Sequence, residues 1–338
     1  MENPVTLPDS TICAGVDLGG TKIAIILGTS TGQIRCEAKI DTLPLLGPKD
    51  AISRIAQTLE EIERRTRTRA VCIGMGVPGL ADAEAGVIRF LPNLPTDWHG
   101  FPAADFIREM TGRPAFLLND ARLAALGEYS FGKRAEIRDL LVVTVGTGIG
   151  GGLILDGHLR LGRYAAAGEI GHHTIIPDGP LCTCGNRGCL ETLVNGRVLA
   201  AEGTELAKNG MAPKLAALVS GDLSAITPRE MAIAAREGDE CVALAIERAA
   251  QFLGIGIANA VSITAVDHVV ITGGLGALGD LLLEPIRKAV RERVRMFPSD
   301  CVVIERSSIG DRAGALGALA LAFQKRSNSR NMKGDFCA

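Results

Sequence analysis

The sequence has no excess of either charge: 36 Lys and Arg residues face 38 Asp and Glu residues, which gives a formal net charge of −2. A protein that holds nucleic acid non-specifically needs a basic surface to neutralise phosphates, so we expect no nucleic-acid partner. The sequence also lacks an apolar run of the roughly 18 residues that span a bilayer, so we expect no membrane partner. These absences favour a protein that acts on a small molecule.

We also expect no secretory signal peptide, because residues 1–10 form an acidic, proline-containing segment. We therefore expect the nine cysteines in the cytoplasm, where disulfides are rare. Five of them lie among aliphatic residues and are expected to be buried as small apolar side chains. These five are Cys13, Cys36, Cys72, Cys241 and Cys301.

Two common nucleotide-binding motifs are not expected to occur here: one is absent from the sequence, and the other lacks its structural context. No Gly-x-x-x-x-Gly-Lys-Ser/Thr run occurs, which excludes a P-loop protein. Gly146, Gly148 and Gly151 match the dinucleotide fingerprint letter for letter, but that fingerprint requires a strand, a loop and then a helix. An aliphatic strand follows here, and three consecutive glycines at 150–152 would begin a poor helix. A nicotinamide-binding domain is therefore not expected.

Two segments of the chain resemble each other. Residues 12–27 and 140–155 each hold an aliphatic strand, a turn rich in Gly and Thr, and a second aliphatic strand. A further turn and a third stretch follow, at 33–35 and 158–160. The separation of about 127 residues predicts two related domains that each begin with a β-meander. A length of 338 residues, 47% of them apolar, suits two α/β domains.

Helical patterns and buried strands follow each meander. In the first half we expect helices at 50–66, 103–111 and 121–129, and strands at 70–77 and 115–118. In the second half we expect helices at 194–206, 228–236, 240–260, 281–297 and 313–323, and a strand at 268–272.

A polar segment holds four candidate metal ligands within eighteen residues. Four soft or borderline ligands are what a closed tetrahedral zinc site needs. Buried apolar cysteines or a disulfide are the alternatives, but the neighbouring residues are polar and the chain is expected in the cytoplasm. We expect His172 to be the histidine ligand and His173 to pack or to face solvent. Glu169 and Glu191 frame the segment, whose predicted ligands are His172, Cys182, Cys184 and Cys189.

The two Gly/Thr turns can each hold a phosphate, because small residues let backbone N–H groups converge on an oxyanion and threonine adds a donor. One turn from each domain would grip a triphosphate from both sides of a cleft. Ordinary hairpin turns are the alternative, although these rarely need so many glycines and threonines. Lys22 would face either the phosphates or solvent. The predicted nucleotide-binding residues are Gly19, Gly20, Thr21, Lys22, Gly146, Thr147, Gly148 and Gly150.

Five motifs together resemble the ROK family of sugar kinases and repressors, within the actin/hexokinase/Hsp70 superfamily. They lie at 17–22, 118–121, 146–152, 168–172 and 182–191. The resemblance covers residues 12–323 and implies an α/β fold of two actin-like (ribonuclease H-like) domains with an active-site cleft between them. The implied parts are a domain at 12–122, a larger domain with the zinc loop at 123–312, a helix at 313–323 that returns to the first domain, and an unstructured tail at 325–338.

Asp120 follows an aliphatic strand and opens a helix, so its side chain can cap that helix. The resemblance implies a second role, in which Asp120 accepts the proton of a sugar hydroxyl that attacks the γ-phosphate of ATP. Such proton transfer contributes about 10²–10⁴-fold to the rate. The resemblance also implies that Asp17 orients Mg²⁺, directly or through water, and that Gly273 and Gly274 seat the adenosine.

The resemblance further implies which residues contact the sugar. The zinc-bound histidine is among them, and Gly79 lets the backbone approach. Loop 91–98 resembles a loop of the glucokinase branch of the family, in which Asn93 is a further candidate sugar contact. The alternative is that this loop is a surface turn. The implied sugar-binding residues are Gly79, Asn119, Asp120, Glu169, His172 and Glu191.

Three classes of protein fit these motifs: an ATP-dependent hexose kinase, a repressor and an inactive sugar-binding protein. Repressors of this family carry a helix-turn-helix domain, for which about eleven residues before the first strand are too few. Asp120 and the two glycine turns favour an active enzyme over an inactive one. We expect glucose as substrate because of loop 91–98 and segment 177–180, while N-acetylmannosamine and N-acetylglucosamine stay open. By analogy we expect a homodimer or a higher homo-oligomer.

Overall fold

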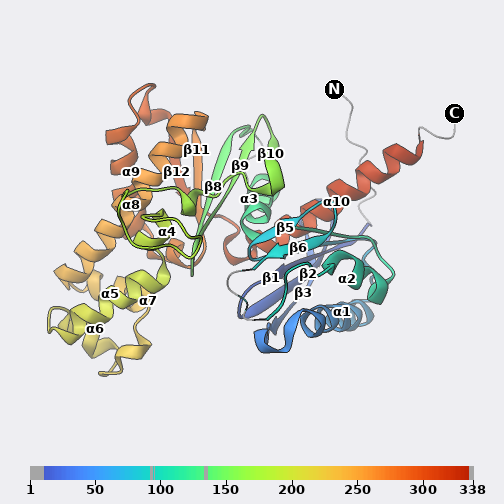
Figure 1. The fold of residues 1–338 in the computed structure, drawn as a ribbon, viewed down its shortest axis with the longest axis horizontal. Helices are drawn as coiled ribbons and strands as arrows, with labels where there is room; N and C mark the ends of the chain where they lie inside the picture. The colour runs from blue at the N-terminus through green and yellow to red at the C-terminus, as the bar shows by residue number, and fades with distance from the viewer. Residues whose placement is uncertain (1–10, 92–93, 95, 133–135, 335–338) are drawn as a thin grey trace. The chain divides into compact units, whose positions relative to one another are not determined.

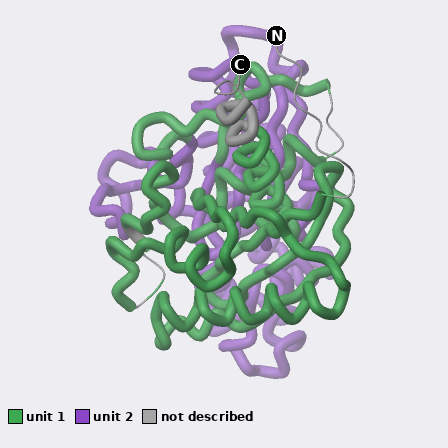
Figure 2. The backbone as a smooth tube through the Cα atoms, turned by 90° about the vertical axis from the view of Figure 1, so that its right-hand side faces the viewer, with its two compact units in different colours: residues 1–138, 152–167, 312–338 green, residues 139–151, 168–311 purple. Residues whose placement is uncertain are grey.

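The computed structural model describes residues 11–91, 94, 96–132 and 136–334. The chain divides into two units, drawn in green and purple in Figure 2. Unit 1 comprises Met1–Arg138, Gly152–Ala167 and Arg312–Ala338, and unit 2 comprises Asp139–Gly151 and Gly168–Asp311. The first unit thus extends past residue 122, where we expected it to end, because the described residues of 123–138 and residues 152–167 belong to it.

The first sheet has the strand order β3-β2-β1-β4-β7. Its strands β1, β2 and β3 are labelled in Figure 1. Strands β1 to β3 form the predicted antiparallel meander, and β4 and β7 run parallel to β1. The strand β1 is aliphatic and almost wholly buried, as expected for a strand covered on both faces. The bounds are β1 Cys13–Leu18, β2 Lys22–Gly28, β3 Ile34–Asp41, β4 Ile73–Val77 and β7 Ala115–Asn119; a hairpin of β5 Leu80–Asp82 and β6 Val87–Phe90 follows β4.

The second sheet repeats this topology, with the order β10-β9-β8-β11-β12. Its first three strands again form a meander, and β11 and β12 add to it in parallel. The strands β1 and β8 begin at residues 13 and 140, a difference of 127, so the predicted internal repeat is confirmed. The bounds are β8 Leu140–Val145, β9 Ile149–Leu155, β10 His158–Arg160, β11 His268–Thr272 and β12 Val303–Arg306.

The predicted helices are present, and apart from the end of α10 their ends differ by a few residues; α4 and α6 were not predicted. Helix α1 turns one apolar face inward, where Ile52, Ile55 and Leu59 are buried. The bounds are α1 Gly47–Thr66, α2 Ala103–Thr111, α3 Asp120–Phe131, α4 Leu190–Leu193, α5 Gly196–Lys208, α6 Pro213–Leu218, α7 Pro228–Arg236, α8 Glu240–Thr264, α9 Asp280–Arg293 and α10 Ala313–Gly334.

Among the described helices, α8 is long and apolar enough to cross a membrane. Its most apolar window has a mean hydropathy of 1.5, and 56% of that window is buried inside the structure. The buried face packs against α9, α7 and α5. Such burial is typical of a core helix, so α8 is weak evidence for a membrane segment.

Helix α10 belongs to unit 1 and packs against α3 and the strands β1 and β4. Glycines allow this close contact. A Cβ on Gly74 of β4 would lie 1.9 Å from the carbonyl oxygen of Ala318, and one on Gly317 of α10 would lie 1.7 Å from that of Leu123. The helix continues to Gly334, so the expectation of an unstructured tail from residue 325 is wrong for residues 325–334.

We expect Gly317→Ala to destabilise the protein. An alanine in a helix normally gains about 1 kcal/mol over glycine, but here its methyl group would overlap the Leu123 carbonyl. Such overpacking typically costs about 1–3 kcal/mol, so urea denaturation should show a lower free energy of unfolding. The matched comparison is Gly203→Ala inside α5, where the Cβ would meet the side chain of the buried Met231 and not a backbone carbonyl, so a smaller loss is expected. Equal stability of Gly317→Ala and the wild type would contradict this packing.

One sequence expectation concerns loop 91–98. In loop 91–98 the side chains of Leu91, Leu94 and Trp98 are buried in the core, so this part of the loop is not a surface turn; Asn93 lies outside the described residues.

Of the cysteines expected in the core, Cys13 and Cys72 are buried, whereas Cys36 and Cys241 are half-buried and Cys301 is exposed. The expectation was wrong for Cys301 because it ends a short helical turn at Ser299–Cys301, between α9 and β12.

Candidate active site and metal site

In unit 1, two carboxylates lie where parallel strands end. Asp17 is the second-last residue of β1, and Asp120 opens α3 directly after β7. The strand β4 lies between them in the sheet. A Cβ on its Gly76 would be 3.3 Å from the Asp17 Oδ1 atom and 3.7 Å from the Asp120 Cα atom. The parallel register therefore brings the two predicted acids together, and a glycine between them leaves the room.

Asn119 connects the residues around Asp120. Its side-chain oxygen accepts hydrogen bonds from the N–H groups of Ala121 (3.0 Å) and Arg122 (3.2 Å), so Asn119 is the N-cap of α3. Its amide nitrogen donates to the Gly79 carbonyl (2.9 Å) and to Asp120 Oδ1 (2.9 Å). The capping role that Asp120 was able to fill thus belongs to Asn119, which also orients the Asp120 carboxylate.

The predicted sugar contact at Gly79 lies on the same side of unit 1. Gly79 follows β4 and has a φ of 128°, which side chains other than hydrogen disfavour. Asn119 holds its carbonyl group. The structure thus places Gly79, Asn119 and Asp120 in one hydrogen-bonded group at the ends of β4 and β7.

The pKa of Asp17 is raised to about 7, first by burial of the carboxyl group and second by the negative charge of Asp120. The first turn of α10 also crowds this group, since a Cβ on Gly314 would lie 2.3 Å from Asp17 Oδ2. A buried carboxyl beside a second carboxylate favours a cation, because the cation compensates both charges.

We expect Asp17→Asn to stabilise the metal-free protein at pH 8. Between about pH 4 and pH 7 the unfolded chain has released the Asp17 proton and the folded chain keeps it, so the stability contribution of this group falls as pH rises. The shift from 3.8 to about 7 corresponds to about 4 kcal/mol at most. Thermal unfolding in Mg²⁺-free buffer from pH 4 to pH 8 measures the effect.

The control for this variant is Asp105→Asn on α2, where the carboxylate is exposed and pairs with Arg108. It should leave the pH dependence of the melting temperature unchanged. If Asp17→Asn and the wild type lose stability equally between pH 4 and pH 7, the raised pKa is contradicted.

The first Gly/Thr turn joins β1 and β2, as predicted. Thr42, directly after β3, fixes this turn from two sides: its hydroxyl donates to the Gly19 carbonyl (2.7 Å), and its N–H donates to the Thr21 carbonyl (2.9 Å). Within the part of the chain that the structure describes, and apart from the residues next to Gly20, no heavy atom lies within 4 Å of the position where a Cβ on Gly20 would be. Lys22 forms an exposed ion pair with Asp41. The turn is thus held from β3 and open at Gly20.

The second Gly/Thr turn joins β8 and β9 in unit 2. The Gly146 N–H donates to the Gly148 carbonyl (2.9 Å), and Thr147 between them is exposed. Gly150 lies in β9, so a strand follows the turn and the rejection of the dinucleotide fingerprint is confirmed. Gly273 follows the adjacent strand β11, and Gly274 begins the next helical turn. A Cβ on Gly273 would lie 2.7 Å from the Val145 carbonyl, so both predicted nucleotide segments lie at neighbouring strand ends.

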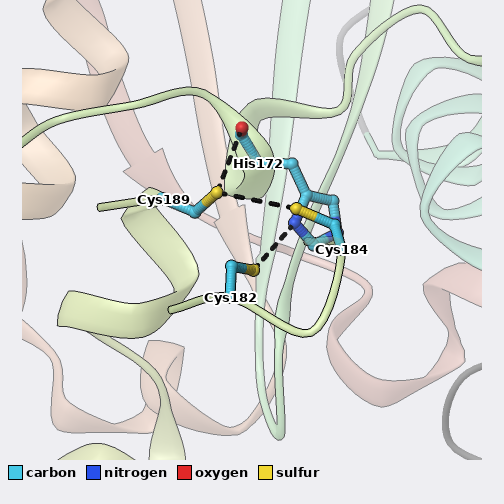
Figure 3. A group of neighbouring side chains, drawn as sticks. All are labelled: His172, Cys182, Cys184 and Cys189. Carbon is cyan, nitrogen blue, oxygen red and sulfur yellow. Dashed lines mark hydrogen bonds between the residues drawn. The ribbon is translucent and has the colours of Figure 1, made fainter. Parts of the chain in front are cut away.

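The four predicted metal ligands form one cluster in unit 2 (Figure 3). The Sγ atoms of Cys184 and Cys189 are 3.7 Å apart, and Cys182 Sγ is 3.5 Å from His172 Nδ1. A tetrahedral zinc ion with Zn–S bonds of about 2.3 Å and Zn–N bonds of about 2.0 Å separates its ligand atoms by about 3.8 Å and about 3.5 Å. A disulfide would need sulfurs about 2.05 Å apart. The distances therefore fit zinc.

The thiols of the cluster differ in their acidity. Backbone hydrogen bonding at Asn186 lowers the pKa of Cys184, whereas burial raises the pKa of Cys189 to about 12. A buried thiol binds metal only as a thiolate, so a cation must supply the compensation. His173 does not join the cluster: its Nδ1 atom contacts the Ile170 carbonyl, and its ring packs near Gly256 of α8.

The two glutamates that frame the cluster lie in the segments that carry its ligands. Glu169 directly precedes the helical turn Ile170–His172. Glu191 lies in the first turn of α4, two residues after Cys189, and its Oε2 atom accepts a hydrogen bond from the Ile149 N–H (2.7 Å). Sequence reasoning missed this contact, as it missed Thr42 and Gly314, because these pairs are far apart in the chain and no motif links them.

A model of the ROK family matches residues 13–325 of this chain. The chain belongs to the ROK family. It is 35% identical over 310 residues to a glucokinase of Thermotoga maritima, covering 91% of this chain and 96% of that protein. It is 29% identical to an N-acetylmannosamine kinase of Citrobacter koseri, covering 91% of this chain and 97% of that protein.

A solved ROK structure has the same fold. The ROK family glucokinase of Streptomyces griseus, in complex with glucose and AMPPNP, superposes with a TM-score of 0.82 at 32% identity, covering 93% of this chain and 99% of that one. The comparison confirms the predicted fold class of actin-like (ribonuclease H-like) α/β domains. Together with the glucokinase relative, it identifies this ROK protein as an ATP-dependent sugar kinase.

Proposed function

We propose that this ROK protein transfers the γ-phosphoryl group of MgATP to the 6-hydroxyl of glucose, with Asp120 as general base. One observation carries the proposal: Asn119 caps α3, and its amide and the Ala121 N–H both donate to Asp120 Oδ1, so the Asp120 carboxylate is held in place. The glucokinase relatives and the glucose complex of a similar ROK structure support glucose as the sugar.

The proposed phosphoryl transfer forms one bond, breaks one bond and moves one proton. The 6-hydroxyl oxygen forms a bond to the γ-phosphorus, the bond from this phosphorus to the oxygen shared with the β-phosphate breaks, and ADP leaves. Asp120 takes the hydroxyl proton. Such a transfer depends mainly on positioning and on Mg²⁺, which neutralises developing charge. Asp17, whose buried carboxyl favours a cation, would orient Mg²⁺ directly or through water.

We further propose that the two Gly/Thr turns hold the phosphates, with the strand end at β11 beside the nucleotide. Both turns offer backbone N–H groups from small residues, which suits an oxyanion. Lys22 is paired with Asp41 and is the weakest member of this set. The proposed nucleotide-binding residues are Asp17, Gly19, Gly20, Thr21, Lys22, Gly146, Thr147, Gly148, Gly150, Gly273 and Gly274.

We propose that the sugar hydroxyls bind to Gly79, Asn119, Asp120, Glu169, His172 and Glu191. His172, Cys182, Cys184 and Cys189 would hold a structural zinc ion, whose contribution is to fix the segments that carry Glu169 and Glu191. The distances within the cluster support this ligand set.

A second candidate substrate is N-acetylmannosamine, which is favoured by the kinase relative of that name. N-acetylglucosamine is a candidate for the same reason as the other two sugars: all three present hydroxyls that carboxylates can bind. The cytoplasmic location and the homo-oligomeric state stay predictions.

Phosphorus NMR tests the proposed reaction. Incubation of the protein with MgATP and glucose should produce one phosphate ester, whose ³¹P signal couples to two methylene protons as expected of a 6-phosphate. An ester signal that couples to a single proton would contradict the 6-hydroxyl as acceptor. Absence of any ester with glucose, and its appearance with N-acetylmannosamine, would favour the second candidate.

A further inference from the structure

Two hydrogen bonds bracket the turn between β8 and β9, and both come from the segment that follows the cysteine cluster. At one end of the turn, the Ile149 N–H donates to Glu191 Oε2 at 2.7 Å. At the other end, the Gly196 N–H donates to the Gly146 carbonyl at 2.8 Å. The start of α4 and the start of α5 therefore hold this turn from both sides.

The Glu191 carboxylate also lies directly against the turn. A Cβ on Gly148 would be 2.3 Å from Glu191 Oε2. On the other side of the same strand start, a Cβ on Gly171 would be 2.1 Å from the Ile149 carbonyl oxygen. Glycine is therefore required at residue 171, where the contact is with backbone, whereas a side chain at residue 148 would displace the Glu191 carboxylate. Ile149 is held between Glu191 and Gly171.

These contacts are tied to the metal cluster and to α5. Gly171 precedes the predicted ligand His172, and Glu191 comes two residues after Cys189. The Glu191 carbonyl accepts a hydrogen bond from the buried Asn195 side chain (2.8 Å), which also caps α5 through the Val198 N–H (2.9 Å). Glu191 is thus fixed at its main chain as well as at its carboxylate.

We infer that Glu191 is a positioning residue for the nucleotide: its carboxylate holds the β8–β9 turn in the shape that presents backbone N–H groups to phosphate. The inference rests on the proposed function, in which this turn binds ATP and Glu191 binds the sugar. A phosphate site made of backbone groups depends on their directions, so a turn released at Ile149 loses affinity for nucleotide even when no sugar is present.

The test is MgADP binding to the full-length, zinc-loaded protein without sugar, measured by isothermal titration calorimetry. Glu191→Ala should weaken binding about tenfold or more, because a hydrogen bond to a charged group is lost. Glu191→Gln should stay within about threefold of the wild type, because its amide oxygen still accepts from the Ile149 N–H. Glu205→Ala, which removes an exposed carboxylate from α5, is the matched control and should bind MgADP as the wild type does.

Two further readouts follow the turn itself. Hydrogen exchange of the peptide that contains Ile149 should be faster in Glu191→Ala than in the wild type, and unchanged in Glu191→Gln. Gly148→Ala, whose methyl group would displace the carboxylate, should weaken MgADP binding to a similar extent. This variant tests the inference from the other side of the contact if Glu191→Ala fails to fold.

The outcomes separate this inference from the proposed function. Equal MgADP affinity of Glu191→Ala and the wild type overturns the inference and leaves the proposed function standing. Equal losses in the alanine and glutamine variants also overturn it, because the charge, and not the hydrogen bond to the turn, would then be responsible. A folded wild-type protein that does not bind MgADP overturns both.

Discussion

Asp120→Asn should lower kcat by about 10²–10⁴-fold, because an amide cannot take the proton of the attacking hydroxyl. The fold around residue 120 should persist. The Asp120 Oδ1 atom accepts hydrogen bonds from the Asn119 side chain and the Ala121 N–H, and an asparagine oxygen can accept both. Sugar and MgATP affinities should therefore stay within about threefold of the wild type. Steady-state ADP release and calorimetric titration of the sugar measure the two effects.

Asp105→Asn is the matched control for this variant, since it makes the same chemical change at an exposed carboxylate of α2. Its kcat should equal that of the wild type. Removal of the charge at residue 120 should also lower the pKa of Asp17, because Asp120 is one of the two causes that raise it. Near-normal turnover by Asp120→Asn would rule out Asp120 as the general base.

Cys184→Ser should release the zinc ion and weaken sugar binding by about tenfold or more. Three of four ligands hold zinc poorly, and changes at or beside a metal site commonly cost about 10–100-fold in affinity or activity. Without the ion, the segments before His172 and after Cys189 lose their shared anchor, and these segments carry Glu169 and Glu191. Metal analysis by mass spectrometry and sugar titration without nucleotide measure the two effects.

Cys301→Ser is the control, because Cys301 is exposed and lies outside the cluster. It should keep one zinc per chain and the wild-type sugar affinity. A wild-type protein that contains no zinc after purification without chelators would contradict the metal assignment. Zinc loss with unchanged sugar affinity would keep the metal site and contradict its role in shaping the sugar site.

The sequence predicted the strands of both sheets except β12 at Val303–Arg306, for a physical reason. Aliphatic runs separated by Gly/Thr turns can form only short buried strands, and the recurrence of this pattern after 127 residues indicated a repeated sheet. The strand at His268–Thr272 and the helix at Ala103–Thr111 have the predicted bounds. The local sequence pattern was sufficient to predict these elements, because their bounds depend on residues that are close together in the chain.

Tertiary contacts were the part that the sequence did not predict. Helix α10 runs past Phe323, and residues 152–167 pack with the first unit, although no local signal marks either feature. Both Asn119 and Asp120 are good N-cap residues, so only the hydrogen bonds reveal that Asn119 caps α3. The Glu191 contact with Ile149 spans 42 residues and depends on a glycine that periodicity does not single out.

The rate of ADP release from MgATP, measured for glucose, N-acetylmannosamine, N-acetylglucosamine, fructose, mannose and allose, tests the central claim most directly. The proposed function predicts that glucose has a kcat/KM far above that of every other sugar, and that Asp120→Asn abolishes this difference. A folded, zinc-loaded protein that releases ADP at the same low rate with every sugar would contradict the assignment as a hexose kinase acting through Asp120.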